Sequence, residues 1–345
     1  MMAFDAGEQD LKQQFRAMAQ GSQSLVVAFV GITNGLFPAL DRLGKASADA
    51  MAIEARRDAG YVRRWCDAAY AFGYLEAEGE VFRLSETGAA MRPDAPDTLM
   101  PMAVQTVLNA HVAERAAELT ANGERPGEHV LGECRMAAPW YGFMFETTHA
   151  AFFEQEVCPA VPIFREVDEK GGMIVDLGCG NGWYLRALAR RCHAVHGLGL
   201  DGFDENIVQA KRHAEAEGLD GRLRFTLGDL HDFAIGAEVD LIAMNRALHH
   251  VWEKGGEAFL ARLRTHLRPG GAVAIWEPDW PAERSLLRSP SHRHLAFQNL
   301  SEHVQGNHLL CAEEIAAAFR AVDMRPEVFR FRGGAESFVV ARKPA

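Results

Sequence analysis

A glycine-rich loop between a buried strand and a helix carries the clearest chemistry in this sequence. The segment MIVDLGCGNGWYLRALAR spans residues 173–190, and Gly178, Gly180 and Gly182 stand at alternate positions within it. Glycines let the backbone turn tightly and approach a ligand, beside a helix N-terminus with free N–H groups. The spacing differs from the GxGxxG of dinucleotide sites. Asp176, at the end of the strand, suits a ligand with a cationic amino-acid portion better than a pyrophosphate.

The loop DLGCGNG resembles the first motif of the class I S-adenosylmethionine (SAM)-dependent methyltransferases, and further motifs follow in order. AVHGLGLD resembles the second strand, and the resemblance assigns its Asp201 to the ribose hydroxyls, which a carboxylate can accept. LRFTLGD resembles the third strand, and its Asp229 is assigned to the adenine amino group. The cofactor residues implied by the resemblance are Asp176, Gly178, Gly180, Gly182, Asp201, Gly228, Asp229, Leu230 and Asn245.

The resemblance continues to the end of the chain and implies a fold. VDLIAMNRALHH resembles the fourth strand, LRPGGAVAIWEP the fifth, and PEVFRFRGGAESFVVAR the terminal antiparallel hairpin. We therefore predict an α/β fold with a Rossmann-like, seven-stranded class I methyltransferase sheet. The reaction implied is transfer of a methyl group from the SAM sulfonium to a small-molecule nucleophile. Another Rossmann-like nucleotide-binding domain is the alternative.

One interpretation of the catalytic group is a general base. His249 follows the fourth strand, where small-molecule O-methyltransferases place a histidine that takes the proton of the acceptor hydroxyl, and an imidazole suits this role near neutral pH. Those enzymes often have Asp after that histidine, whereas this chain has His250. Glu277 could orient the base, and Arg246 could meet a substrate carboxylate.

A second interpretation, which we favour at this point, is a metal site. His249 or His250, Glu277 and His303 would form a set of two histidines and one carboxylate, which a divalent transition metal such as Fe or Zn accepts. The arrangement resembles the bacterial α-keto acid C-methyltransferases of non-proteinogenic amino-acid biosynthesis. A chelated α-keto acid would then be methylated at its β-carbon. The third alternative is that the histidines only position the substrate.

The N-terminal part has a different sequence pattern, with helical periodicity and a small β element. Leu11, Phe15 and Met18 predict an amphipathic first helix, and a hairpin is predicted around residues 78–79. Short helices are predicted at residues 35–43, after the caps Ser47 and Asp49, and at 61–72, where Tyr61, Trp65 and Ala69 would share a face. This pattern is typical of a winged helix, which in homodimeric small-molecule methyltransferases serves dimerisation and covers the substrate. We predict a winged-helix domain at 1–135, linking helices at 136–170 and a SAM-binding domain at 171–345.

Winged helices also bind DNA, so the charge of this module matters. Residues 36–95 contain eight Lys and Arg and ten Asp and Glu, a net charge of −2. Phosphate contacts dominate DNA affinity and require the opposite sign. A SAM-binding transcriptional regulator that reads DNA through Arg63 and Arg64 is therefore only a remote alternative.

Composition sets the remaining limits. The 345 residues are 48% hydrophobic, enough for a large core, and carry a net charge of −11. Six cysteines without a CxxC pair are typical of a reduced compartment. The start MMAFDAGEQD lacks the features of a signal peptide, and the most apolar stretch, residues 24–40, is interrupted by glycines and a proline. We expect a cytoplasmic homodimer that acts on a small molecule and binds neither nucleic acid nor membrane.

Overall fold

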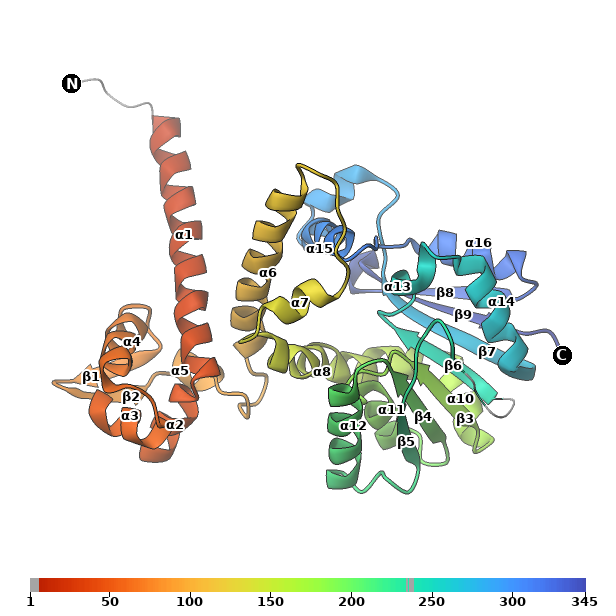
Figure 1. The fold of residues 1–345 in the computed structure, drawn as a ribbon, viewed down its shortest axis with the longest axis horizontal. Helices are drawn as coiled ribbons and strands as arrows, with labels where there is room; N and C mark the ends of the chain where they lie inside the picture. Colours follow the sequence, from red (N-terminus) through yellow and green to blue (C-terminus); the bar gives the residue numbers. More distant parts are fainter. Residues whose placement is uncertain (1–5, 234, 236–238) are drawn as a thin grey trace. The chain divides into compact units, whose positions relative to one another are not determined.

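The computed structural model describes residues 6–233, 235 and 239–345, which divide into two compact units (Figure 1). The first unit comprises the residues up to 114 together with 131–147, and the second comprises 115–130 and 148–345. Residues 115–130 thus belong to the second unit, whereas the sequence places them in the N-terminal domain. This segment contacts the site described below.

The first unit contains the predicted three helices and hairpin. They are α2 (Leu36–Leu43), α3 (Ala48–Ala55), α4 (Ala59–Ala71) and the antiparallel pair β1 (Leu75–Glu78) and β2 (Val81–Leu84). Ser47 caps α3 as predicted, because its side chain accepts a hydrogen bond from the Ala50 N–H. Trp65 and Ala69 are buried on α4 together with Val62, whereas Tyr61, one turn before Trp65, is 81% exposed.

The other helical elements up to residue 152 vary in length. They are α1 (Ala6–Thr33), α5 (Glu86–Ala90), α6 (Met100–Leu119), α7 (His129–Glu133), the 3-10 turn η1 (Ala138–Trp140) and α8 (Tyr141–Phe152). Leu11, Phe15 and Met18 lie on α1 as predicted, and all three are more than half exposed. Among the described residues no single helix is long and apolar enough to span a membrane; α1 and α2 meet the length and composition criteria only together, across a 69° bend.

The second unit contains a seven-stranded mixed sheet, as predicted. Its strand order is β5-β4-β3-β6-β7-β9-β8, with β3 to β7 parallel and β9 antiparallel to both of its neighbours. The bounds are β3 (Met173–Leu177), β4 (His196–Asp201), β5 (Leu223–Leu227), β6 (Val239–Asn245), β7 (Leu267–Pro278), β8 (Arg325–Phe331) and β9 (Glu336–Arg342). The strand order reverses between β3 and β6, and ligands of open α/β sheets bind at such a switch point, beyond the carboxyl ends of the strands.

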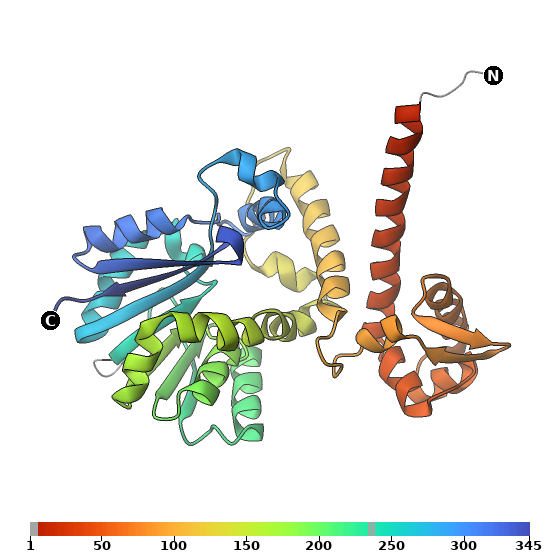
Figure 2. The same cartoon turned by 180° about the vertical axis from the view of Figure 1, so that it is seen from behind.

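Helices cover both faces of this sheet (Figure 2). On β6, Leu241 and Ala243 belong to one core cluster, and Ile242 and Met244 belong to the other, as the alternation of a strand requires. The helices and turns of this unit are η2 (Phe153–Val157), α9 (Cys158–Ala160), α10 (Pro162–Glu169), α11 (Trp183–Arg191), α12 (Asp204–Ala216), α13 (His249–Trp252), α14 (Gly256–His266), η3 (Arg284–Arg288), α15 (Arg293–Val304), α16 (Ala312–Ala321) and η4 (Arg332–Gly334). Because helices cover both faces of the sheet, the ends of the strands are where side chains can contact a ligand.

Candidate active site

The glycine loop connects β3 to α11 and requires its glycines. Gly178 has a φ of 78°, and a Cβ there would come within 2.9 Å of the Cβ of Ala247. Gly182 has a φ of 76°, and a Cβ there would come within 2.7 Å of the Phe225 ring. Larger residues at either position would combine backbone strain with a steric clash. The loop is therefore pressed against β5 and the segment after β6.

The predicted acid Asp201 is the last residue of β4, and Asp229 follows the neighbouring strand β5. Asp201 Oδ2 accepts a hydrogen bond of 2.8 Å from the Gly180 N–H, and its Oδ1 accepts one of 3.0 Å from the Phe203 N–H. Asp229 is exposed in the loop after β5, where its Oδ1 accepts from the His231 N–H at 2.8 Å. The Gly228 N–H donates to the Asp201 carbonyl at 3.0 Å, so these loops adjoin.

Three buried polar atoms beside the loop have no hydrogen-bond partner within the described part of the chain. They are Asp176 Oδ2, Asn245 Oδ1 and Tyr184 Oη. Asn245 Nδ2 donates to the other Asp176 oxygen at 3.1 Å. Burial raises the pKa of the Asp176 carboxyl to about 8, although the bond from Asn245 acts in the opposite direction. An uncompensated buried carboxyl of this kind fits the amino group of SAM, which would supply both a charge and hydrogen-bond donors.

His249 lies at the start of α13, and Glu277 from the neighbouring strand fixes it there. Glu277 Oε1 accepts from the Leu248 N–H at 2.8 Å, which satisfies a free donor at the helix start. Its Oε2 lies 2.7 Å from His249 Nδ1. Glu277 and His249 are 1% and 3% exposed. The carboxylate thereby sets the orientation of the imidazole and leaves Nε2 as the proton-accepting atom.

Glu302 approaches the other side of the same ring. Its Oε2 lies 3.5 Å from His249 Nε2, and the residue is 7% exposed on α15. Burial alone would lower the pKa of His249, but Glu277 and Glu302 together raise it to about 10. In return, His249 holds the pKa of Glu302 below its usual range despite burial. The protonated imidazole is therefore the form that this environment stabilises.

The metal set predicted from the sequence, His249, Glu277 and His303, is not brought together. His303 is exposed on α15, and its neighbour Glu302 points to His249 in its place. Both oxygens of Glu277 are already engaged by the start of α13. Glu302 could have been found from helical spacing, because it shares a face with the buried Leu295 seven residues earlier.

A different group offers metal ligands. The ligand atoms of His249, His250 and Glu302 all lie within 4.8 Å of one another. The His250 ring lies 4.1 Å from that of His249, centroid to centroid. His250 Nδ1 is 2.9 Å from Asn307 Nδ2 and 3.0 Å from Glu128 Oε1, so the predicted site residue His250 does adjoin His249.

Arg246 is held by a buried acid. Its Nη2 forms an ion pair with Glu336, which also accepts from Trp276 Nε1 at 2.9 Å. Arg246 has a φ of 54°, and its N–H donates to the Trp276 carbonyl at 2.7 Å. The Arg246 charge, predicted to meet a substrate carboxylate, is thus already paired with Glu336 within the chain.

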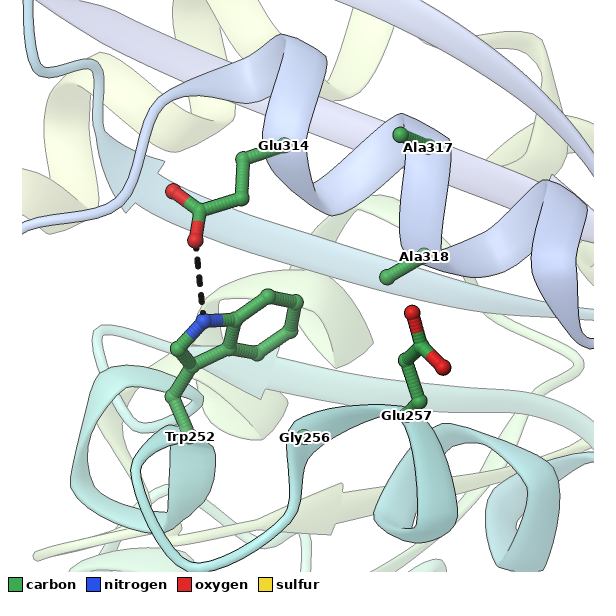
Figure 3. A pocket seen from close by; sticks show the side chains of 6 residues that line it. All are labelled: Trp252, Gly256, Glu257, Glu314, Ala317 and Ala318. Atoms are coloured by element: carbon green, nitrogen blue, oxygen red, sulfur yellow. Dashed lines mark hydrogen bonds between the residues drawn. The ribbon is translucent and has the colours of Figure 1, made fainter.

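Trp252, the last residue of α13, fixes the C-terminal end of this helix. Its Nε1 donates to Glu314 Oε1 on α16 at 3.0 Å, beside a groove of about 410 Å³ that contains none of the predicted site residues (Figure 3). A Cβ at Gly256 would come within 2.5 Å of the Trp252 ring, so this glycine makes room for the indole. The helix that carries His249 is therefore anchored at both ends.

Part of the chain matches a known protein family. Residues 174–271 match the family model described as a methyltransferase domain. Trans-aconitate 2-methyltransferase of Acidovorax sp. (strain JS42) is 34% identical over 152 residues, which is 43% of this chain and 54% of that protein. The chain thus spans about half the length of the curated relatives that it matches.

Solved structures extend the likeness to the whole chain. An O-methyltransferase family protein from Burkholderia thailandensis has a TM-score of 0.72 at 17% identity, covering 100% of this chain and 99% of that one. Human N-acetylserotonin methyltransferase, solved with SAM, has a TM-score of 0.69 at 19% identity and covers 100% of both chains. At these identities the likeness shows the fold, a class I methyltransferase sheet with a helical N-terminal domain.

Proposed function

We propose that this chain, which carries a methyltransferase domain, is a SAM-dependent O-methyltransferase that modifies a hydroxyl of a small aromatic molecule. The observation that carries the proposal is the buried His249, whose Nδ1 is bonded to Glu277 at 2.7 Å. This bond keeps the Nδ1 proton in place, so Nε2 can accept the proton of an acceptor hydroxyl. The base interpretation thus replaces the metal interpretation as the preferred one.

The roles of the residues follow from their positions. Asp176, Asp201 and the glycine loop would hold SAM, which supplies a methyl group on a positively charged sulfur. His249 Nε2 would take the hydroxyl proton as the acceptor oxygen bonds to the methyl carbon and the bond from that carbon to sulfur breaks, which leaves the sulfur as a neutral thioether. Glu277 and Glu302 then face an imidazolium whose charge they neutralise. The buried surroundings of His249 keep water from competing for the proton.

The surroundings of His249 favour an acidic acceptor hydroxyl. Glu277 and Glu302 raise the pKa of His249, which makes the neutral imidazole a stronger base. A phenolic hydroxyl, with an ordinary pKa of about 10, is acidic enough to give up its proton to such a base. An aliphatic hydroxyl is a far weaker acid and would not be deprotonated as readily by this base.

The aromatic acceptor rests on the solved structures of the same fold. The rings next to Glu277 carry no weight here, because Trp276 is 1% exposed and packs with His149 and Phe152 in the core. The human protein of the same fold is named for N-acetylserotonin, and the acceptor class is carried over to this chain as part of the proposal.

The proposal is tested with methyl-labelled SAM and a panel of small phenols, aromatic carboxylic acids and α-keto acids. We expect label on a phenolic oxygen, identified by mass spectrometry of the product. Label on the carbon of an α-keto acid, or on a carboxylate, would contradict the O-methylation proposed here. The curated relatives named for trans-aconitate make the carboxylic acids a necessary part of the panel.

The second candidate function is metal-dependent C-methylation, and the close approach of His249, His250 and Glu302 favours it. Two imidazoles and a carboxylate fit a divalent transition metal, so these three residues would hold it. A bound ion would supply Lewis acidity to a chelated α-keto acid. Elemental analysis of untagged protein separates the candidates: one equivalent of metal, lost in His250→Ala and kept in His303→Ala, would support this second function.

A further inference from the structure

The segment between α6 and α7 contacts the two elements that carry His249 and Glu302. Arg125 Nη2 is 2.7 Å from Glu253 Oε2 at the end of α13 and also donates to the Gly306 carbonyl, just after α15. The Gly127 N–H donates to the Val304 carbonyl at 3.4 Å, and Glu128 Oε1 is 3.0 Å from His250 Nδ1. We call residues 120–128 the strap; it runs beside α15 in both views (Figures 1 and 2).

The strap contacts two elements that follow neighbouring strands of the sheet, α13 after β6 and α15 after β7. Arg125 and Glu253 are 128 positions apart in the chain. Glu253 is also 3.1 Å from His308 Nδ1, which links α13 to the segment after α15 a second time. Glu128 makes the contact nearest to the base, because the ring of its partner His250 lies 4.1 Å from that of His249.

We infer that Glu128 is a positioning residue, which acts through His250 to hold the His249 imidazole in register with Glu302. The inference rests on the proposed function, since His249 is the base there. His250 directly follows the base in the chain, and Glu128 Oε1, 3.0 Å from its Nδ1, is the carboxylate by which the strap contacts it. Asn307 Nδ2 also lies 2.9 Å from His250 Nδ1, but a ring nitrogen that donates its proton to Glu128 cannot accept from this amide, so the inference uses the contact with Glu128.

The expected loss of rate on removing the Glu128 carboxylate is limited by the solvent exposure of this side chain. The Glu128 side chain is 43% exposed, and ion pairs of this kind contribute up to about 1 kcal/mol, or about five-fold in a rate. The carboxylate of Glu128 has a matched control in Glu124, which is exposed on the same strap and contacts Asn122 through its backbone N–H. Glu124→Ala removes the same charge from the same segment.

The test compares Glu128→Ala, Glu128→Gln and Glu124→Ala in the full chain. We expect Glu128→Ala to lower kcat about five-fold with the KM for SAM unchanged, and Glu128→Gln, which can still bond His250, to recover most of the loss. In a His250→Ala background, Glu128→Ala should have no further effect. A Glu128→Ala kcat equal to that of Glu124→Ala, or a full additional loss in the His250→Ala background, would overturn the inference.

A second readout does not depend on the acceptor. Amide hydrogen exchange of residues 120–130 and of α13 should become faster in Glu128→Ala and stay unchanged in Glu124→Ala. Unchanged exchange in Glu128→Ala would show that the strap is held without this contact and would overturn the inference. If wild-type protein transfers no methyl group to any acceptor, the proposed function fails on its own, while the exchange result still decides whether Glu128 holds the strap.

Discussion

His249 Nδ1 lies 2.7 Å from Glu277 Oε2, and each side chain is almost completely buried. The same glutamate accepts the Leu248 N–H, so one carboxylate fixes both the start of α13 and the ring of the base. Glu277 belongs to β7 and His249 follows β6, two strands paired in parallel with Asn245 opposite Trp276. The register of the sheet therefore decides the geometry of the catalytic pair.

The pH dependence of catalysis should follow His249. Its pKa is raised to about 10 by two carboxylates, so below that pH the free protein holds it mostly protonated and kcat/KM should rise about ten-fold per pH unit. Glu302→Gln removes one negative charge and lowers this pKa, which moves the rise to lower pH. His303→Gln, an exposed change at the next residue, is the control and should leave the pH profile in place. A profile that is the same in Glu302→Gln and wild type would contradict this role of Glu302.

Binding of SAM should depend on the protonation state of Asp176, at lower pH than the titration of His249. Its pKa of about 8 means that the carboxyl is protonated at pH 6, and a cationic amino group prefers the carboxylate. SAM affinity, measured by calorimetry, should therefore rise between pH 6 and 8 and then level off. Asp176→Asn should weaken binding about 10- to 100-fold and remove this dependence, because a bond to a charged group contributes about 1.5–3 kcal/mol.

The control for that experiment is Asp232→Asn, an exposed acid in the loop after β5. It should leave both the affinity and its pH dependence unchanged. If Asp176→Asn binds SAM as tightly as wild type at pH 8, Asp176 does not bind the amino group of SAM.

The exposed apolar side chains of α1 predict self-association. Phe15 is 64% exposed and Met18 is 66% exposed on the same helix, and large exposed apolar side chains in a row usually mark an interface. Phe15→Glu should convert a homodimer into a monomer in light scattering after gel filtration. Gln13→Glu adds the same charge to an exposed position of α1 and should leave the dimer intact. A wild-type protein that is already monomeric would refute the prediction.

Much of the fold could be predicted because its signals are local. The cap at Ser47, the hairpin after Tyr74 and the glycines of the loop each depend on a few neighbouring residues. The spacing of Tyr61, Trp65 and Ala69 does not show which of them is buried, because Tyr61 lies in the first turn of α4 and is exposed. The predicted and observed sheets agree because buried parallel strands have a distinct pattern.

The site was harder to predict, since its residues come from distant segments. His249 and Glu277 could be found because each follows a strand, and parallel strands bring their ends to one edge. Glu302 differs from the predicted His303 by one helix position, which decides between a buried and an exposed side chain. Glu128 left no signal, because nothing local in a loop of polar residues indicates contact with a histidine more than a hundred positions away.

The most direct measurement is methyl transfer from labelled SAM to a small phenol by wild type and His249→Asn, with SAM affinity measured for both. The account predicts an O-methylated product from wild type and a rate about 100- to 10,000-fold lower for His249→Asn at unchanged SAM affinity, as expected for loss of a general base. A His249→Asn protein that transfers the methyl group at the wild-type rate would contradict the account.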